Sequence, residues 1–313
     1  MERIAIVGYG LIGRGWAIVF ARAGHQVVVH DADPTALERG MDAIEANLRE
    51  LHEFGLIGEA PELVLARIAQ ATSLEDAIAG ADYVQESVAE KLEVKREVFA
   101  AMDALAAPDT VLASSTSYIP TSAFSAGLSG RHRCLVVHPT HPVHLIPVVE
   151  LSPAPWTAAD VIERTSDLQR RVGQSPVVLR KEIEGFVFNR LQAALLGEAM
   201  TLWEAGYASA DDIDRTVRDG VGLRWSFMGP FETFDLAAPG GVVDAGVRYG
   251  GAIGQIAANR VAADWTPELM ARLEAERAEI QPRDALAARA RWRDRRLMGL
   301  LAHKSRAAAD DGS

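Results

Sequence analysis

The stretch that decides the fold is RIAIVGYGLIGRGWAIVFARAGHQVVVHD, residues 3–31. It opens with an apolar, β-branched run typical of a buried strand, and a second such run, QVVVHD, closes it. Between them, LIGRGWAIVFARAG places apolar side chains at helical spacing and ends at Gly24, a helix stop signal. This order predicts a strand–helix–strand unit of the kind that builds a parallel sheet.

A glycine-rich motif, GYGLIG at residues 8–13, joins the first strand to the helix. In this context the first glycine allows a tight turn, the second lets the backbone approach a pyrophosphate, and the third lets helix and strand pack closely. The helix N-terminus then offers N–H donors to the phosphates. We therefore predict a dinucleotide site whose contacts come from Gly8, Gly10, Leu11, Ile12 and Gly13.

The second strand ends in an acid, Asp31, where such folds hold the adenosine ribose. Its neighbours are Ala32 and Asp33 rather than arginine, so a 2′-phosphate would meet two carboxylates. NAD is therefore favoured over NADP. A glycine-rich turn without a ligand and a flavin on the same fold remain alternatives.

The later sequence changes character near residue 184. Before it, strand patterns alternate with helices, although residues 34–70 are expected to form two charged amphipathic helices packed as a hairpin. After it, β-branched runs stop and long helical patterns follow. We predict a Rossmann-type α/β NAD-binding domain, residues 1–184, and an all-helical domain that takes part in substrate binding, residues 185–313.

Composition narrows the function classes. The chain has 313 residues and a net charge of −11, which disfavours a nucleic-acid partner. A membrane-spanning helix needs a stretch of about 18 apolar residues, and the sequence contains none. Cys134 is the single cysteine, and Met1 is followed directly by a strand pattern rather than by a signal peptide. We expect a cytoplasmic protein that acts on a small molecule.

Three histidines stand at three-residue spacing in LVVHPTHPVHLIPVVEL, residues 135–151. His138 ends one strand pattern and Glu150 lies in the next, with a proline-rich loop between them, so adjacent strands can place the two side by side. A buried glutamate needs a partner, and a histidine oriented by a carboxylate is suited to take a hydroxyl proton as hydride leaves. His138 is the predicted catalytic base.

A metal site is the competing interpretation of these histidines. Three prolines prevent His138, His141 and His144 from sharing a helix face, and no cysteine or nearby aspartate completes a ligand set. We expect no metal, and we interpret His144 as an incidental loop residue.

Taken together, these motifs resemble the 3-hydroxyacyl-CoA dehydrogenase family. The shared features are the glycine motif with its aspartate, ESVAEKLEVKREVF, SSTS, the His…Glu pair, and EGFVFNR followed by GPFE. SSTSYIP, GLRWSFMGPFETFDL and RWRDRRLMGLLAHKSR look closest to the branch of lambda-crystallin and L-gulonate 3-dehydrogenase, and carnitine dehydrogenases share some features.

The resemblance implies a role for each matching residue. His138 is the base and Glu150 its orienting carboxylate, Ser117 hydrogen-bonds the substrate oxygen, and Asn189 helps to polarise the reacting centre. The positions expected on the cofactor side are Asp31, Glu90 and Lys95. The family also implies a homodimer formed through the helical half.

Simpler interpretations exist for several of these residues. Ser117 would also fit as the cap of a turn, Asn189 as a hydrogen-bonding residue at a helix terminus, and Glu90 with Lys95 as a solvated pair. Two positions depart from the family pattern: Ser115 replaces an asparagine, and His141 stands where an asparagine usually precedes the proline. The sequence assigns no role to His141.

Arg224 is the clue to the substrate. It precedes the GP turn in GVGLRWSFMGP, among Trp225, Phe227 and Phe231, where a guanidinium suits a bidentate carboxylate contact. The sequence thus favours oxidation of the 3-hydroxyl of a small hydroxy acid, with L-gulonate to 3-dehydro-L-gulonate as first choice. The alternative is a structural ion pair between Arg224 and Glu232.

Other functions compete with this one. The chain would also suit an L-3-hydroxyacyl-CoA dehydrogenase of the 3-hydroxybutyryl-CoA type, or an L-carnitine 3-dehydrogenase with an aromatic enclosure for the quaternary ammonium. A protein that binds NAD without catalysis is the alternative from another class, because this branch includes lens crystallins. The intact set of His138, Glu150, Ser117 and Asn189 argues against it.

Overall fold

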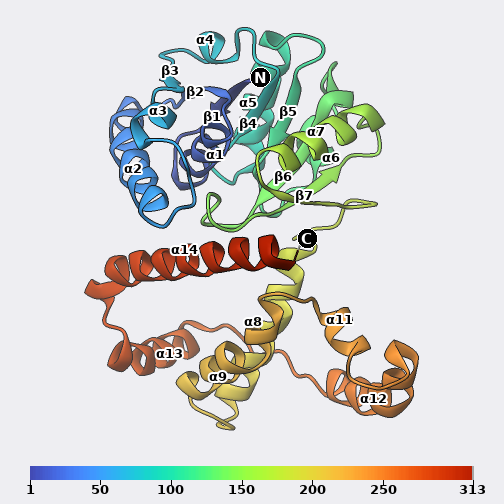
Figure 1. The fold of residues 1–313 in the computed structure, drawn as a ribbon. Coiled ribbons are helices and arrows are strands. Elements are labelled where there is room, and N and C mark those ends of the chain that lie inside the picture. The colour runs from blue at the N-terminus through green and yellow to red at the C-terminus, as the bar shows by residue number, and fades with distance from the viewer. Residues whose placement is uncertain (312–313) are drawn as a thin grey trace. The chain divides into compact units, whose positions relative to one another are not determined.

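The computed structural model describes residues 1–311, and the contacts divide the chain into two compact units. The first contains residues 1–189 and the chain from residue 290 onward, and the second contains residues 190–289. Figure 1 shows the elements of both units.

An eight-stranded sheet forms the centre of the first unit (Figure 1). Its strand order is β3-β2-β1-β4-β5-β6-β7-β8, and all neighbours are parallel except β6 and β7. The strands are β1 (Arg3–Val7), β2 (Gln26–His30), β3 (Ile68–Gln70), β4 (Tyr83–Glu86), β5 (Val111–Ser114), β6 (Cys134–Pro139), β7 (Val148–Pro153) and β8 (Ser175–Val178).

Helices cover both faces of this sheet, as crossover connections require. They are α1 (Leu11–Arg22), α2 (Pro34–Glu53), α3 (Pro61–Leu65), α4 (Leu74–Ile78), α5 (Leu92–Leu105), α6 (Thr121–Ser125) and α7 (Ala159–Arg171), with a 3₁₀ turn at Arg131–Arg133. One buried cluster unites the sheet with α1, α2 and α7, and a second unites it with α4, α5 and α6. The predicted Rossmann-type architecture is confirmed.

One expected helix is wrong in its second half. The pattern PELVLARIAQ suggested a helix over residues 61–70, but α3 ends at Leu65 and β3 follows. Val27 of β2 pairs with Ile68, so β3 adds a short edge strand to the sheet. Pairing with an open strand edge overrode the local helix propensity of alanine, leucine and arginine.

The second unit is helical. Its elements are α8 (Phe188–Glu204, whose first two residues belong to the first unit), α9 (Ala210–Thr216), a π-helical turn (Val217–Val221), α10 (Gly222–Trp225), α11 (Pro230–Asp235), α12 (Gly241–Ala258), α13 (Pro267–Ile280) and a 3₁₀ turn (Arg283–Ala285). Met200, Trp203, Ala210 and Leu269 form a small buried cluster. This is the helical part expected after the α/β domain.

The last helix, α14 (Leu286–Asp311), packs mostly on the first unit. Met298 is fully buried in the larger core cluster, and Arg295 forms ion pairs with Glu50 and Glu53 and lies over the Phe54 ring. The basic segment of this helix therefore serves an intramolecular contact. The domain boundary between residues 184 and 185 stays a prediction.

Candidate active site

The turn between β1 and α1 has the geometry that a dinucleotide requires. Gly8 has φ +95°, and a Cβ there would lie 2.6 Å from the Ser87 backbone carbonyl. A Cβ on Gly13 would lie 2.0 Å from the Gly8 oxygen, whereas the space beside Gly10 is open. Among residues 1–311, no side chain caps the N-terminus of α1. Its first amides, at Leu11 and Ile12, thus remain to bind phosphate.

Asp31 both closes this turn and borders the cofactor cavity. Its carboxylate accepts hydrogen bonds from the Tyr9 amide at 2.6 Å and the Asp33 amide at 2.9 Å. A cavity of about 570 Å³ lies beside it, lined by Gly8, Gly10 and Asp31 together with apolar side chains from α4 and α5. The residues present therefore fit NAD, with the ribose near Asp31 and the pyrophosphate at the glycine turn.

His138 and Glu150 face each other across β6 and β7, as the sequence predicted. The two residues are directly opposite in the antiparallel register, and His138 Nδ1 lies 3.0 Å from Glu150 Oε2. Both side chains are buried. Because Nδ1 keeps its proton and donates it in a hydrogen bond to the carboxylate, the other ring nitrogen, Nε2, is left as the basic atom.

The second oxygen of Glu150 is held by the start of α8. Glu150 Oε1 accepts hydrogen bonds from the amides of Val187 at 2.8 Å and Phe188 at 2.9 Å. These amides point at Glu150 because Gly185 and Phe186 both have positive φ, +71° and +48°. A left-handed conformation costs about 1 kcal/mol for a residue such as Phe186. Its ring is fully buried, 5.2 Å from the His138 ring.

Ser117 and Asn189 lie together as well. The Asn189 side-chain amide donates to the Ser117 carbonyl at 2.9 Å. Within residues 1–311, no partner is found for the Ser117 hydroxyl, which is half-buried. It therefore remains available to a substrate oxygen. The first turn of α8 thus contacts both Glu150 and the Ser117 loop.

Glu90 organises the Ser117 loop. Its Oε1 accepts from the amides of Ser117 and Tyr118 and from the Thr116 hydroxyl. Partial burial raises the pKa of Glu90, but the bond from Thr116 and the charge of Lys95 outweigh it, so the pKa lies below its usual value. Neither Glu90 nor Lys95 lines the cofactor cavity.

Sequence reasoning missed Glu86, a buried acid behind this loop. Lys95 is buried between Glu90 and Glu86, with Nζ 3.0 Å from Glu86 Oε1 and 3.2 Å from Glu90 Oε2. Burial raises the pKa of Glu86, although Lys95 and Ser114 oppose this. The sequence VQES, residues 84–87, could have pointed to Glu86, because its polar residues stand at the end of a strand pattern. Lys95 does pair with Glu90, but its side chain is buried, so the interpretation as a solvated surface pair is wrong for Lys95.

Ser115, which departs from the asparagine implied by the family resemblance, belongs to a polar cluster. Its hydroxyl lies 2.7 Å from Gln85 Nε2, 3.1 Å from Trp16 Nε1 and 2.9 Å from the Ser87 hydroxyl. Gln85 also reaches the carbonyl of Val137, next to the base. These bonds hold the ends of β4 and β5 against β6 beside His138.

The other two histidines of the loop do not join this site. His138 is the member that pairs with Glu150, whereas His144 borders a different cavity. His141 is exposed, and its pKa is lowered by partial burial and by Arg293. Within residues 1–311, no group of three or more His, Cys, Asp or Glu side chains is arranged to hold a metal ion.

Arg224 lies on α10 in the second unit. Its side chain is exposed, as are those of Trp225, Phe227 and Phe231. In the part of the chain that the structure describes, Arg224 forms no ion pair with Glu232. The guanidinium therefore remains available to an external carboxylate.

Two models of one enzyme family match most of the chain. Residues 3–183 match the 3-hydroxyacyl-CoA dehydrogenase NAD binding domain, and residues 185–281 match the C-terminal domain of the same enzymes. A lambda-crystallin homolog from Homo sapiens is 36% identical over 307 residues, covering 96% of each chain. An L-carnitine dehydrogenase from Oceanobacillus iheyensis is 39% identical over 249 residues, covering 80% of this chain and 79% of the relative.

Two solved structures are similar in fold and sequence. The NAD⁺-dependent 5-formyl-3-hydroxy-2-methylpyridine 4-carboxylic acid 5-dehydrogenase has a TM-score of 0.75 and 31% identity, covering 92% of this chain and 97% of the other. The 3-hydroxybutyryl-CoA dehydrogenase of Escherichia coli K12 has a TM-score of 0.66 and 32% identity, covering 81% of this chain and 53% of the other.

The glycine turn, Asp31 and the buried His–Glu pair define an NAD-dependent oxidoreductase that acts on a CH–OH group. More particularly, the chain belongs to the 3-hydroxyacyl-CoA dehydrogenase family. The resemblance to the lambda-crystallin branch is confirmed as well. Among the described residues, no helix is long and apolar enough to cross a membrane.

Proposed function

We propose that this enzyme oxidises the 3-hydroxyl of a small hydroxy acid that carries a carboxylate, with L-gulonate giving 3-dehydro-L-gulonate. Likeness to lambda-crystallin homologs along 96% of the chain supports the branch. The single observation that carries the choice of a free acid is Arg224, an exposed guanidinium beside aromatic side chains and without an ion pair to Glu232 in the described residues. The net charge of −11 disfavours a CoA thioester, because the phosphates of CoA are also negatively charged.

The chemistry follows from the residues of the first unit. Bound NAD supplies the hydride acceptor. His138 Nε2 takes the hydroxyl proton, while Glu150 holds Nδ1 and orients the ring. Ser117 donates a hydrogen bond to the same substrate oxygen, and Asn189 fixes the Ser117 loop through its carbonyl. In the reverse direction, protonated His138 returns the proton to a 3-keto acid.

A substrate panel tests the choice of acid. We expect NADH formation with L-gulonate to exceed that with L-carnitine, 3-hydroxybutyrate and 3-hydroxybutyryl-CoA. Arg224→Met should lower kcat/KM for the free acid by roughly 10- to 100-fold, the value of a charged hydrogen-bonded contact. Arg218→Met is the matched control, because Arg218 is exposed on the preceding turn and pairs with Asp219.

Each other outcome points to a different substrate. Preference for the thioester, with no effect of Arg224→Met, would give Arg224 a structural role and select the acyl-CoA reaction. Preference for L-carnitine is the second candidate, favoured by the 39% identity with the carnitine enzyme. It would direct attention to aromatic side chains, among them Phe188 and Tyr118 of the first unit, as candidates to enclose the quaternary ammonium.

The partner we propose is a second copy of this chain, and the location we propose is cytoplasmic. Helix α12 exposes Val242, Val243, Val247, Ile253 and Ile256, each at least half accessible. So many large apolar side chains on one helix indicate a surface that another chain covers. We expect light scattering to give a dimer mass, and Val247→Asp to shift it toward the monomer. A monomer for the unaltered protein would contradict the proposal, and Arg248→Gln serves as a neighbouring control.

A further inference from the structure

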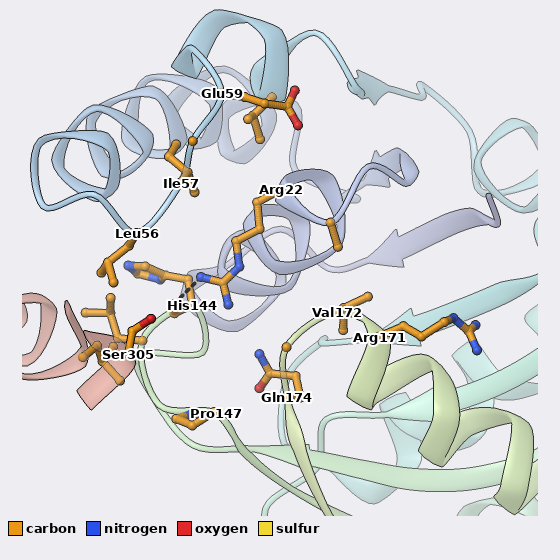
Figure 2. Close-up of a pocket in the computed structure, with 16 residues that line it drawn as sticks. Arg22, Leu56, Ile57, Glu59, His144, Pro147, Arg171, Val172, Gln174 and Ser305 are labelled. Atoms are coloured by element: carbon orange, nitrogen blue, oxygen red, sulfur yellow. Dashed lines mark hydrogen bonds between the residues drawn. The ribbon is translucent and has the colours of Figure 1, made fainter. Parts of the chain in front are cut away.

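A second cavity of about 580 Å³ lies in the first unit, away from the cofactor (Figure 2). It is lined by the end of α1, the segment after α2, the loop that follows His138, the residues before β8, and α14. Helix α1 has twelve residues, so this cavity and the glycine turn lie at opposite ends of a helix about 18 Å long. The cavity is therefore separate from the dinucleotide site.

Buried polar atoms in this cavity have no partners. Gln174 is 6% exposed, and neither its side-chain nitrogen nor its side-chain oxygen forms a hydrogen bond within residues 1–311. His144 is 8% exposed, and its Nε2 is likewise unpaired. An unmatched buried polar group costs about 1–3 kcal/mol, so a folded protein rarely keeps several in one place without a ligand or water.

The cavity also holds a cation without a matching acid. Arg22 donates one bond, at 2.8 Å, to the His144 carbonyl, and no ion pair to Arg22 occurs in the described residues. Other charges at the rim are already paired, since Glu59 binds Arg67 and Arg171 binds Glu2. Burial, then Arg22 and His141, lowers the pKa of His144 to about 4, consistent with a positive local potential.

Apart from Ser305 on α14, the remaining side chains of the lining are apolar and come from four segments: Leu56, Ile57, Val64, Leu145, Val172 and Leu301. Because one terminal nitrogen of Arg22 is used by His144, the opposite edge of the guanidinium stays free. That edge matches a planar carboxylate bidentately. Figure 2 shows Arg22, His144 and Gln174 around the same space.

We propose that this cavity is a second binding site, for a small organic monocarboxylate with an apolar body. The carboxylate pairs with Arg22 and accepts from the Gln174 amide, and the apolar body contacts Leu56, Ile57 and Val172. A compact, fully hydrated ion such as inorganic phosphate would leave the apolar wall unused. The site is independent of the substrate proposed above.

The probe is hexanoate, titrated calorimetrically into the full-length protein, with neutral hexanamide as its matched ligand. We expect one saturable site per chain for hexanoate and binding at least roughly tenfold weaker for hexanamide. Arg22→Met should weaken hexanoate by at least roughly tenfold, and Gln174→Leu by a smaller factor. Arg170→Met, which alters an exposed arginine paired with Asp167, should leave it unchanged.

Three outcomes would overturn the proposal. The first is no saturable binding of hexanoate, and the second is that hexanamide or inorganic phosphate binds as tightly as hexanoate. The third is that hexanoate binding is lost in Arg224→Met but kept in Arg22→Met and in Gln174→Leu. The last would place hexanoate at the substrate site. Arg22→Met also removes the bond to the loop, so circular dichroism of each variant is required. If Arg22→Met fails to fold, Gln174→Leu is the deciding variant. Weaker hexanoate binding in Gln174→Leu supports the proposal, and unchanged binding contradicts it.

Discussion

Replacing His138 with glutamine should leave NAD bound and lower NADH formation by about 10³-fold or more, the upper part of the range for loss of a general base. Glutamine fills a similar volume and can still bond Glu150, but it cannot take a proton. Tryptophan fluorescence titration with NADH measures cofactor binding, and initial rates measure kcat. The expected signature is a large fall in kcat with little change in the dissociation constant of the cofactor.

His25→Gln is the matched control for this variant. His25 is also a buried histidine beside an acid, Glu2, but it lies between α1 and β2. Turnover should survive there. If His138→Gln retained ordinary turnover, the assignment of the base would be wrong. If both histidine variants lost activity, general destabilisation rather than lost proton transfer would be responsible.

Glu150→Gln is the second large effect, and its direction follows from hydrogen-bond polarity. The amides of Val187 and Phe188 donate to one side of the carboxylate. A glutamine must meet them with its oxygen, which turns its NH₂ group toward His138 Nδ1. The imidazole proton then moves to Nε2, so the base presents the wrong tautomer to the substrate. We expect kcat to fall by roughly 10²- to 10⁴-fold.

Asp103→Asn controls for the loss of a buried carboxylate. Asp103 pairs with Arg133 and is also largely inaccessible, but it lies at the end of α5. This variant should lose stability without losing kcat. An active Glu150→Gln enzyme would show that Glu150 does not set the tautomer. In that case the role of the carboxylate would be limited to packing in β7.

Much of this site was predictable because its parts are local in sequence or fixed by strand pairing. The glycine turn and Asp31 lie within one strand–helix–strand unit, and alternation in adjacent strands is sufficient to bring His138 opposite Glu150. What depends on irregular backbone was not predictable. Positive φ at Phe186, a residue that rarely adopts it, aims two amides at Glu150.

Glu90 shows the same limit from another side. The family resemblance implied a cofactor-side position for Glu90, and its spacing from Lys95 also suited a solvated pair. In the structure its carboxylate accepts hydrogen bonds from the backbone amides of the Ser117 loop. Loop amides carry no side-chain signal, so no pattern of residue types reveals where they point. The three-residue edge strand β3 was missed for a related reason, since only its neighbour β2 makes it a strand.

The attachment of α8 to Glu150 and to the Ser117 loop has a consequence for dissecting and recombining these enzymes. A fragment that stops at residue 184 keeps His138 and Glu150 but discards the three donors that Val187, Phe188 and Asn189 supply. A chimera joined at that point would import these donors from a foreign sequence. Splice points placed after Asn189 and before residue 290 keep His138, Glu150 and their three donors on one parent, together with most of α14, and leave residues 190–289 free to be exchanged.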